Sequence, residues 1–279
     1  MVAFAIFSII LYTNNRTPER DTIGAIQDVG GLVFNITGVM AFGGFFGSIL
    51  GIIPLIAPFL REHEKRLYSP TLFYIISTLY HLPSQIFLCA FYQVMFFWVI
   101  DMRRGWESFW KYYIIFLTTY VAASGFGDIL SITVRNIELI NQLNPIVVVP
   151  LFMTSGFIAA VKKMVFYLIG YSYLSFFKFP LQAGIIVEFP PERVQLFLSQ
   201  CTIKPIDCKQ DSCAEKIPNS PFCDPFRVYD FIETSYWLNI VLLLVQAVIF
   251  RVVAALFWCK FTADIPIPYE PFPALDTFK

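Results

Sequence analysis

The sequence predicts an all-α polytopic membrane protein with six transmembrane helices, of which the first is truncated. Composition is the first observation behind this prediction. Of 279 residues, 57% are hydrophobic and 14% are charged, and the mean hydropathy is +0.65. Soluble globular domains rarely combine these values. The second observation is that several stretches contain almost no Asp, Glu, Lys or Arg over the length of about 20 residues that crosses a hydrocarbon core as a helix.

Five apolar segments are expected to cross the membrane completely, the longer ones with some tilt. They are 30–60, 69–100, 112–134, 145–161 and 235–259. The segment 1–13 is also apolar but too short to cross, and it lacks the basic region and cleavage site of a signal peptide. We interpret it as the end of a truncated first span.

Two charged residues interrupt these spans, Asp128 in 112–134 and Arg251 in 235–259. A charge inside hydrocarbon costs about 2.5 to 3.5 kcal/mol on insertion scales, so both should face the bundle interior or a partner. Asp128 belongs either to a substrate path or, as we favour, to packing as a paired residue. For Arg251 we favour a side chain that extends to the cytoplasmic interface.

Two further features of the spans are polar or small. His81 has no Cys, Asp or Glu four residues away that could complete a metal site, so we predict a hydrogen-bonded packing role. Gly43, Gly44, Gly47 and Gly51 permit close contact between helices, either within the chain or at a dimer seam.

Cysteines give the orientation of the bundle, because the short connections on its two sides carry five Lys and Arg each. One polar connection holds Cys201, Cys208, Cys213 and Cys223. Their gaps of seven, five and ten residues differ from the paired spacing of zinc sites. We therefore predict disulfides, with three possible pairings, over a cytosolic zinc site or free thiols.

Disulfides form outside the reducing cytosol, so this prediction fixes the topology. The connection 162–234 is then extracytoplasmic. The connection 61–66 and the Pro-rich tail 261–279 are cytoplasmic.

Several classes of function are excluded by what the chain lacks. The net charge is zero and there is no basic arm, so nucleic acid is not an expected partner. The chain contains neither a P-loop nor a dinucleotide-binding fingerprint. We expect no cofactor, no metal and no enzymatic activity in this chain by itself, and any ATP chemistry must lie on other sequence.

Six short patterns occur in order along the chain. They are Ile26-Gln27-Asp28, Phe59-Leu60-Arg61-Glu62-His63, His81-Leu82-Pro83, the run from Pro150 to Phe157, Tyr171 to Lys178 with Glu188-Phe189, and Phe250-Arg251-Val252-Val253-Ala254. Together with the cysteines before the last span, they resemble the ABC-2 type transmembrane domain of White-type G-subfamily ABC half-transporters. The resemblance covers nearly the whole chain. Asp128 departs from it, because the family usually has an uncharged residue there.

The resemblance implies that residues 1–260 form an ABC-2 type bundle with a re-entrant helical hairpin at about 165–188. It also implies an apolar slot at a two-fold axis between two subunits. The slot residues would be Val39 and Phe42 from the second span, Pro145, Val148, Val149 and Phe152 from the fifth, and Phe157 as an outer plug. Such side chains bind flat apolar ligands by area. Ordinary lipid-facing or core packing is the alternative.

A short charged connection follows the second span. Its residues are Arg61, Glu62, His63, Glu64, Lys65 and Arg66. By resemblance, this coupling turn meets a nucleotide-binding domain. The alternative is an ordinary solvated turn.

The function we favour is the permease part of an ATP-driven exporter of hydrophobic or lipid-like small molecules. By resemblance, it alternates access in a dimer with a second half-transporter. A nucleotide-binding domain absent from this chain then holds ATP and Mg²⁺. Membrane lipid surrounds the protein, in the plasma membrane or an organelle membrane. A non-transporting structural or regulatory subunit is the alternative, and an ion channel is disfavoured because no span shows a regular polar stripe.

Overall fold

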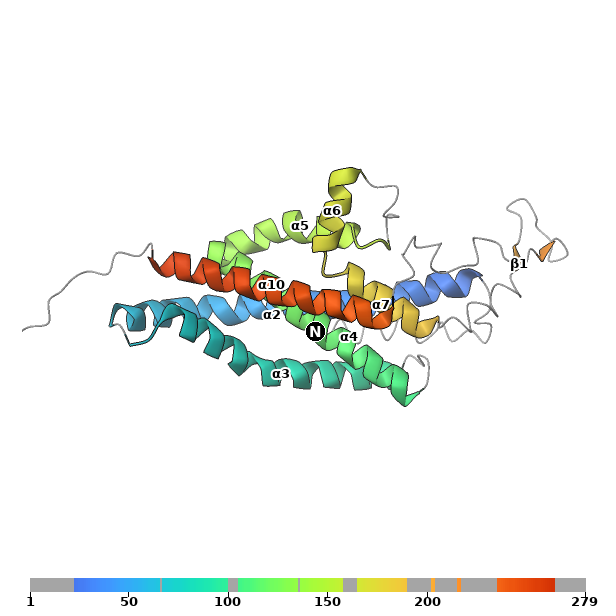
Figure 1. Cartoon of the computed structure of the whole chain (residues 1–279), viewed down its shortest axis with the longest axis horizontal. Coiled ribbons are helices and arrows are strands. Elements are labelled where there is room, and N and C mark those ends of the chain that lie inside the picture. The colour runs from blue at the N-terminus through green and yellow to red at the C-terminus, as the bar shows by residue number, and fades with distance from the viewer. Residues whose placement is uncertain are drawn as a thin grey trace, which may run out of the picture.

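The computed structural model describes residues 23–65, 67–99, 105–134, 136–157, 165–189, 202–203, 215–216 and 235–263. Its helices are α2 (Ile23–Glu64), α3 (Pro70–Val99), α4 (Trp106–Val134), α5 (Ile137–Met153), α6 (Phe166–Leu174), α7 (Lys178–Glu188) and α10 (Tyr236–Ala263). The two-residue strands β1 (Thr202–Ile203) and β2 (Glu215–Lys216) pair antiparallel. Figure 1 shows the long helices α2, α3, α4 and α10 running roughly along the long axis of the molecule.

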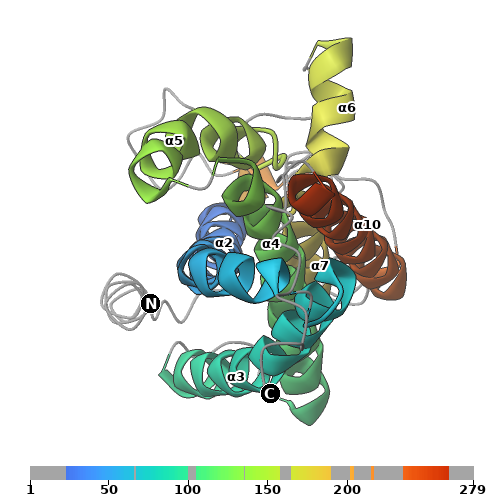
Figure 2. The same ribbon diagram turned by 90° about the vertical axis from the view of Figure 1, so that its left-hand side faces the viewer.

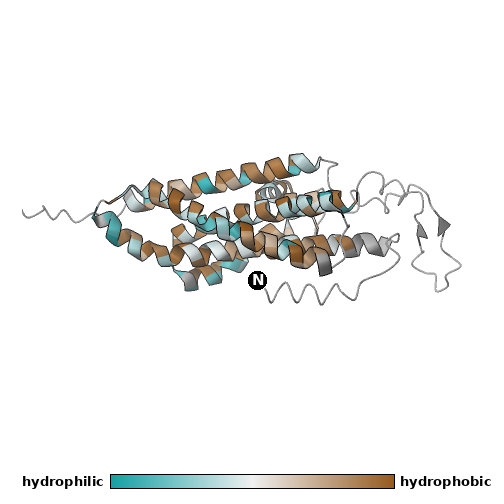
Figure 3. Cartoon of the chain, turned by 90° about the horizontal axis from the view of Figure 1, so that it is seen from below, coloured by the Kyte–Doolittle hydropathy of each residue, from teal (hydrophilic) through white to brown (hydrophobic). Residues whose placement is uncertain are grey.

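Four of the described helices are long and apolar enough to cross a membrane by length and composition. The segments that meet this criterion are Val29–His63, Pro70–Phe97, Trp106–Val134 and Tyr236–Thr262. Figure 3 shows that apolar residues dominate these long helices. The prediction of an all-α, multi-pass membrane protein is therefore confirmed. The count of six spans stays a prediction, because α5 has only 17 residues and the segment 1–13 lies outside the described residues.

Helix α5 differs from the predicted span 145–161, since it begins and ends eight residues earlier. Asn136 caps it, because its side-chain oxygen accepts a hydrogen bond from the backbone N–H of Glu138 at 2.9 Å. The cap satisfies a helix-terminal donor that otherwise has no partner. A search for uncharged runs misses such a start, since the first turn of the helix contains the charged Glu138. Beyond the helix, Gly156 adopts a φ of 95°, which favours glycine.

Helix α4 lies at the centre of the bundle, between α2 and α10 (Figure 2). Glycines allow α2 and α4 to touch through their backbones. A Cβ on Gly44 would lie 2.4 Å from the carbonyl oxygen of Tyr120, and one on Gly127 would lie 2.6 Å from that of Phe45. The glycine stripe of α2 therefore serves helix packing within the chain at Gly44, the first of the two alternatives considered from the sequence.

Helices α6 and α7 fall within the predicted hairpin at 165–188. Almost every residue of α7 is buried, and the helix packs against α2, α4 and α10. The four cysteines of the long connection, Cys201, Cys208, Cys213 and Cys223, lie outside the described residues, so the disulfides stay a prediction.

Candidate functional site

An aromatic cluster joins α2, α5 and α7. It consists of Phe34 and Phe42 of α2, Phe152 of α5, Phe157 beyond the end of α5, and Phe177, which caps the start of α7. The ring centroids of Phe42 and Phe152 are 5.9 Å apart, and those of Phe34 and Phe157 are 4.5 Å apart. Phe152 also meets Phe177 edge to face at 5.3 Å. Three of the predicted slot residues, Phe42, Phe152 and Phe157, are thus brought together, and their role in binding stays a prediction.

A serine between α6 and α7 positions one side of this aromatic cluster. The hydroxyl of Ser175 donates to the carbonyl oxygen of Leu151 in α5 at 2.7 Å and accepts from the backbone N–H of Phe177 at 3.3 Å. Because the same side chain bonds both elements, it holds the start of α7 against α5. Phe177 then lies where its ring can meet Phe152.

The other predicted slot residues lie in different surroundings. Val148 is buried in the core cluster that contains Phe177 and against which Phe42 and Phe152 pack, whereas Val39 packs against a second core formed by α2, α3, α4, α7 and α10. Pro145 and Val149 are exposed on α5. Ile146 of the same helix is 69% exposed, so this side of α5 presents an apolar face without cover from the described residues.

Four of the six residues predicted for the coupling turn, Arg61 to Glu64, form the end of α2, and the connection to α3 is 65–69 rather than 61–66. The name coupling turn is kept for 61–66. Arg61, Glu62 and Lys65 are exposed. Neither the side chain of Glu64 nor any part of Arg66 is among the features that the structure describes.

Aromatic packing anchors the coupling turn to the bundle. Phe59 stacks on His63 at 5.5 Å and contacts Phe73 at 4.6 Å and Trp258 of α10 at 4.9 Å. The hydroxyl of Tyr68 donates a hydrogen bond to Glu62. Burial and this carboxylate raise the pKa of Tyr68 to about 12. Movement of the turn should therefore move α3 and α10 with it.

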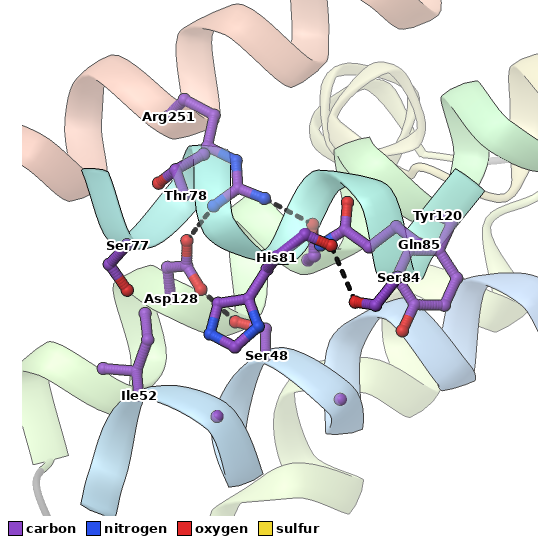
Figure 4. Close-up of a pocket in the computed structure, with 13 residues that line it drawn as sticks. Ser48, Ile52, Ser77, Thr78, His81, Ser84, Gln85, Tyr120, Asp128 and Arg251 are labelled. Carbon is purple, nitrogen blue, oxygen red and sulfur yellow. Dashed lines mark hydrogen bonds and ion pairs between the residues drawn. The ribbon is translucent and has the colours of Figure 1, made fainter. Parts of the chain in front are cut away.

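A buried ion pair joins four helices at a second place. Asp128 of α4 is 2% exposed and pairs with the guanidinium of Arg251 from α10. The same carboxylate accepts hydrogen bonds from the hydroxyls of Ser48 in α2 and Tyr74 in α3, the latter at 2.9 Å. Arg251 also donates to the hydroxyl of Ser124 at 2.6 Å. Ser48, Tyr74, Ser124, Asp128 and Arg251 together form a polar network. Figure 4 labels Ser48, Asp128 and Arg251 of this network.

The polar network confirms one prediction and overturns another. Asp128 is a paired packing residue, as we favoured. The prediction that Arg251 extends to the cytoplasmic interface is wrong, because its guanidinium pairs with the buried carboxylate of Asp128 inside the bundle. A buried charge without a partner is strongly unfavourable, so pairing inside the bundle wins over extension of the side chain. The sequence did contain a signal for this pairing, because the otherwise nearly uncharged spans hold one acidic and one basic residue.

A polar cavity of about 130 Å³ lies beside the ion pair. It is lined by Gly47, Ser48, Gly51 and Ile52 of α2, Ser77, Thr78, His81, Ser84 and Gln85 of α3, Tyr120, Ser124 and Asp128 of α4, and Arg251 of α10. The Nε2 atom of His81 has no hydrogen-bond partner among the described residues, so the predicted hydrogen-bonded packing role is wrong for this atom. Within the same described part, no group of three His, Cys, Asp or Glu residues could hold a metal ion.

Comparison with known proteins places the chain in a transporter family. A family model described as ABC-2 type transporter matches residues 1–189. The chain is 22% identical over 235 residues to the ABC transporter ATP-binding protein/permease wht-1 of Caenorhabditis elegans. This match covers 82% of this chain and 34% of the relative. It is 24% identical over 166 residues to Protein white of Drosophila melanogaster, which covers 59% of this chain and 24% of the relative.

A plant relative gives the same result. The chain is 24% identical over 205 residues to ABC transporter G family member 2 of Arabidopsis thaliana, which covers 70% of this chain and 26% of the relative. The chain thus spans about a third or less of the length of these curated relatives. The resemblance to White-type and G-family proteins is confirmed, and it concerns their membrane domain. Because the matching model covers more than half of the sequence, this chain belongs to the ABC-2 type transporter family.

Proposed function

We propose that this chain is the permease part of an ATP-driven exporter of hydrophobic or lipid-like small molecules. One observation carries the proposal: in a chain of the ABC-2 family, the aromatic cluster joins α2 to α5 directly beside the exposed apolar face of α5. Val149 is 46% exposed on that face and Met153 is 44% exposed. Large apolar surfaces of this kind are covered by lipid or by a partner protein.

The proposed partner is a second half-transporter. Two such α5 faces meeting at a two-fold axis would enclose a slot lined by Pro145 and Val149, with Phe42 and Phe152 half-buried behind them. Aromatic and aliphatic walls bind flat apolar molecules mainly through buried area. Alternating access then requires the slot to open first to one side of the membrane and then to the other.

The proposed energy source is ATP hydrolysis on a nucleotide-binding domain that binds ATP and Mg²⁺. The coupling turn presents exposed charges at Arg61, Glu62 and Lys65, which suits contact with a soluble domain. Phe59 connects this turn to Trp258 in α10, so a push on the turn would be transmitted to the helices as one packed unit.

The test replaces aromatic side chains of the proposed slot in the complete transporter that contains this segment. Phe42→Ala and Phe152→Ala should weaken half-maximal stimulation of ATPase activity by an apolar substrate roughly ten- to a hundredfold, because burying one aromatic side chain is worth about 1.5 to 3 kcal/mol. Phe97→Ala is the control, since Phe97 lies near the C-terminal end of α3 and packs against Phe109 of α4 instead of the aromatic cluster. Equal, small effects at all three positions would contradict the slot.

A further inference from the structure

Helix α5 presents an exposed face along most of its length, and the chemistry of that face changes from one end to the other. The later part is the apolar wall of the proposed slot, with Pro145 and Val149. The first part is polar, because Glu138, Asn141 and Gln142 are also exposed. In the sequence of α5, Glu138 is the only charged residue.

The polar part and the apolar part lie on the same side of the helix. Successive residues of an α-helix turn by about 100°, so positions four, seven and eleven residues apart share one side. Gln142, Pro145 and Val149 follow Glu138 at these three spacings. The exposed carboxylate therefore belongs to the side of α5 that forms the slot wall.

The position of Glu138 along the bundle is inside the slot and not at its end. Glu138 precedes Phe152, which contacts Phe42 of α2, by 14 residues, a rise of about 21 Å. The same rise along α2 from Phe42 leads to Ile56, and α2 continues for about 12 Å more to Glu64. Figure 1 likewise shows α2 and α10 extending beyond α5 at this end.

We propose that the slot takes an amphipathic amine, whose apolar part lies against Pro145 and Val149 and whose protonated nitrogen lies against Glu138. This inference rests on the proposed function, because two copies of the α5 face are needed to enclose the slot. It adds the class of substrate, which is a hydrophobic cation.

Two-fold symmetry strengthens the preference for a cation. The axis duplicates each residue of the face, so the slot would carry two Glu138 carboxylates. Within the described part of the chain, Glu138 has no ion pair. Arg61 is the one Arg or Lys of α2, and it lies about 7 Å beyond the level of Ile56. Like charges beside apolar walls repel more strongly than in water, and a guest cation between them relieves this repulsion.

The neighbouring amides suit the same guest. An ammonium group offers up to three N–H donors and no acceptor. The carboxylate of Glu138 and the side-chain oxygens of Asn141 and Gln142 are acceptors within about one turn of the helix. Hydrogen bonds between an ammonium and a carboxylate are roughly twice as strong as those between neutral groups, so the charge should add to the affinity.

The test uses two fluorescent probes on the complete transporter that contains this segment. Pyrenemethylamine carries the charge, and its N-acetyl derivative keeps the aromatic surface without the charge. Half-maximal stimulation of ATPase activity should need about tenfold less of the amine, because hydrogen bonds to charged groups are the stronger ones. Glu138→Gln should remove this difference, whereas Glu138→Asp should keep it. Gln142→Arg, which adds a cation one turn further along the same side, should weaken the response to the amine alone.

Glu107→Gln is the matched control, because Glu107 is an exposed acid that pairs with Lys111 on α4. It should keep the preference for the amine. Equal potency of the two probes on the wild type would overturn the inference, as would an unchanged preference in both Glu138→Gln and Gln142→Arg. If Glu138→Gln does not fold, Gln142→Arg and the pair of probes still decide.

Phe152→Ala separates this inference from the proposed function. If the slot exists, this variant should weaken the response to both probes alike, since both use the same aromatic surface. A loss with both probes and no preference for the amine would leave the slot intact and reject the hydrophobic cation. No effect of Phe152→Ala on either probe would contradict the slot, and the inference would fail with it.

Discussion

The aromatic cluster and the polar network are built on the same helix, α2, and are held together by different physics. Phe42 faces α5 and α7, whereas Ser48, six residues further on, bonds Asp128 of α4. The aromatic cluster depends on contact area, so its loss should be graded with each side chain removed. In the polar network, loss of one ion leaves the other buried without its partner, so a single substitution should cause a large loss of stability. The aromatic cluster therefore suits a surface that exchanges ligands, and the polar network suits a fixed joint, that is, a contact between helices that does not change.

The largest effect is expected for Arg251→Met, which leaves Asp128 buried and unpaired. The free energy of unfolding in detergent should fall by about 3 to 5 kcal/mol. Adding Asp128→Leu to the same chain should recover most of this loss, because replacing both partners of a buried pair by apolar residues is often neutral. A single variant within about 1 kcal/mol of the wild type would show that the polar network is not a fixed joint.

Part of this comparison was accessible from the sequence. The uncharged run at 69–100 gave α3 almost to the residue, because a charge or turn residue lies at each of its ends. The resemblance brought Phe42, Phe152 and Phe157 together in advance. A local signal decides the first, since helix ends depend on neighbouring residues, whereas the second comes only from the resemblance to the family.

The rest could not be predicted, because it depends on pairs far apart in the chain. Nothing near Arg251 shows that its partner is Asp128 in another helix, or that Tyr74 and Ser48 complete the shell. The exposed state of Pro145 is also invisible in the sequence, since an apolar residue can face lipid, partner or core equally well.

A smaller effect is expected from the tyrosine of the polar network. Tyr74→Phe removes a hydroxyl that donates to the buried carboxylate, and hydrogen bonds to charged groups are worth about 1.5 to 3 kcal/mol. Tyr68→Phe removes the same kind of bond to the exposed Glu62 and should change stability by less than about 1 kcal/mol. Chemical unfolding of the two variants measures the difference. Equal losses would mean that burial does not set the strength of these bonds.

A comparable or smaller loss of stability is expected from Gly44, which lies between Phe42 and Ser48 on α2. Gly44→Ala places a methyl group against the backbone of α4 and should destabilise the chain by about 1 to 3 kcal/mol. Gly170→Ala in α6 is the control, since nothing lies within 4 Å of its Cβ position. It should be neutral or slightly stabilising, because alanine is the better helix former. The prediction fails if both variants melt alike.

The smallest effect concerns pH at the coupling turn. The pKa of Tyr68 is raised from its ordinary value near 10 to about 12, so the folded chain holds this proton where the unfolded chain has lost it. Stability from Tyr68 is therefore complete below pH of about 10 and is lost as the pH rises towards about 12. Over that range the melting temperature of the wild type should fall more than that of Tyr68→Phe. If the melting temperatures of the two proteins fall in parallel over this range, Tyr68 does not contribute to the pH dependence of stability, and this prediction is wrong.

The most direct test of the account compares both regions in one complete transporter. Phe42→Ala should shift the substrate concentration for half-maximal ATPase stimulation roughly tenfold or more. The paired replacement Arg251→Met with Asp128→Leu should leave that concentration unchanged. This is the result expected if the aromatic cluster binds substrate and the polar network only joins helices. A shift with the paired replacement and none with Phe42→Ala would contradict the account and place substrate binding at the polar network.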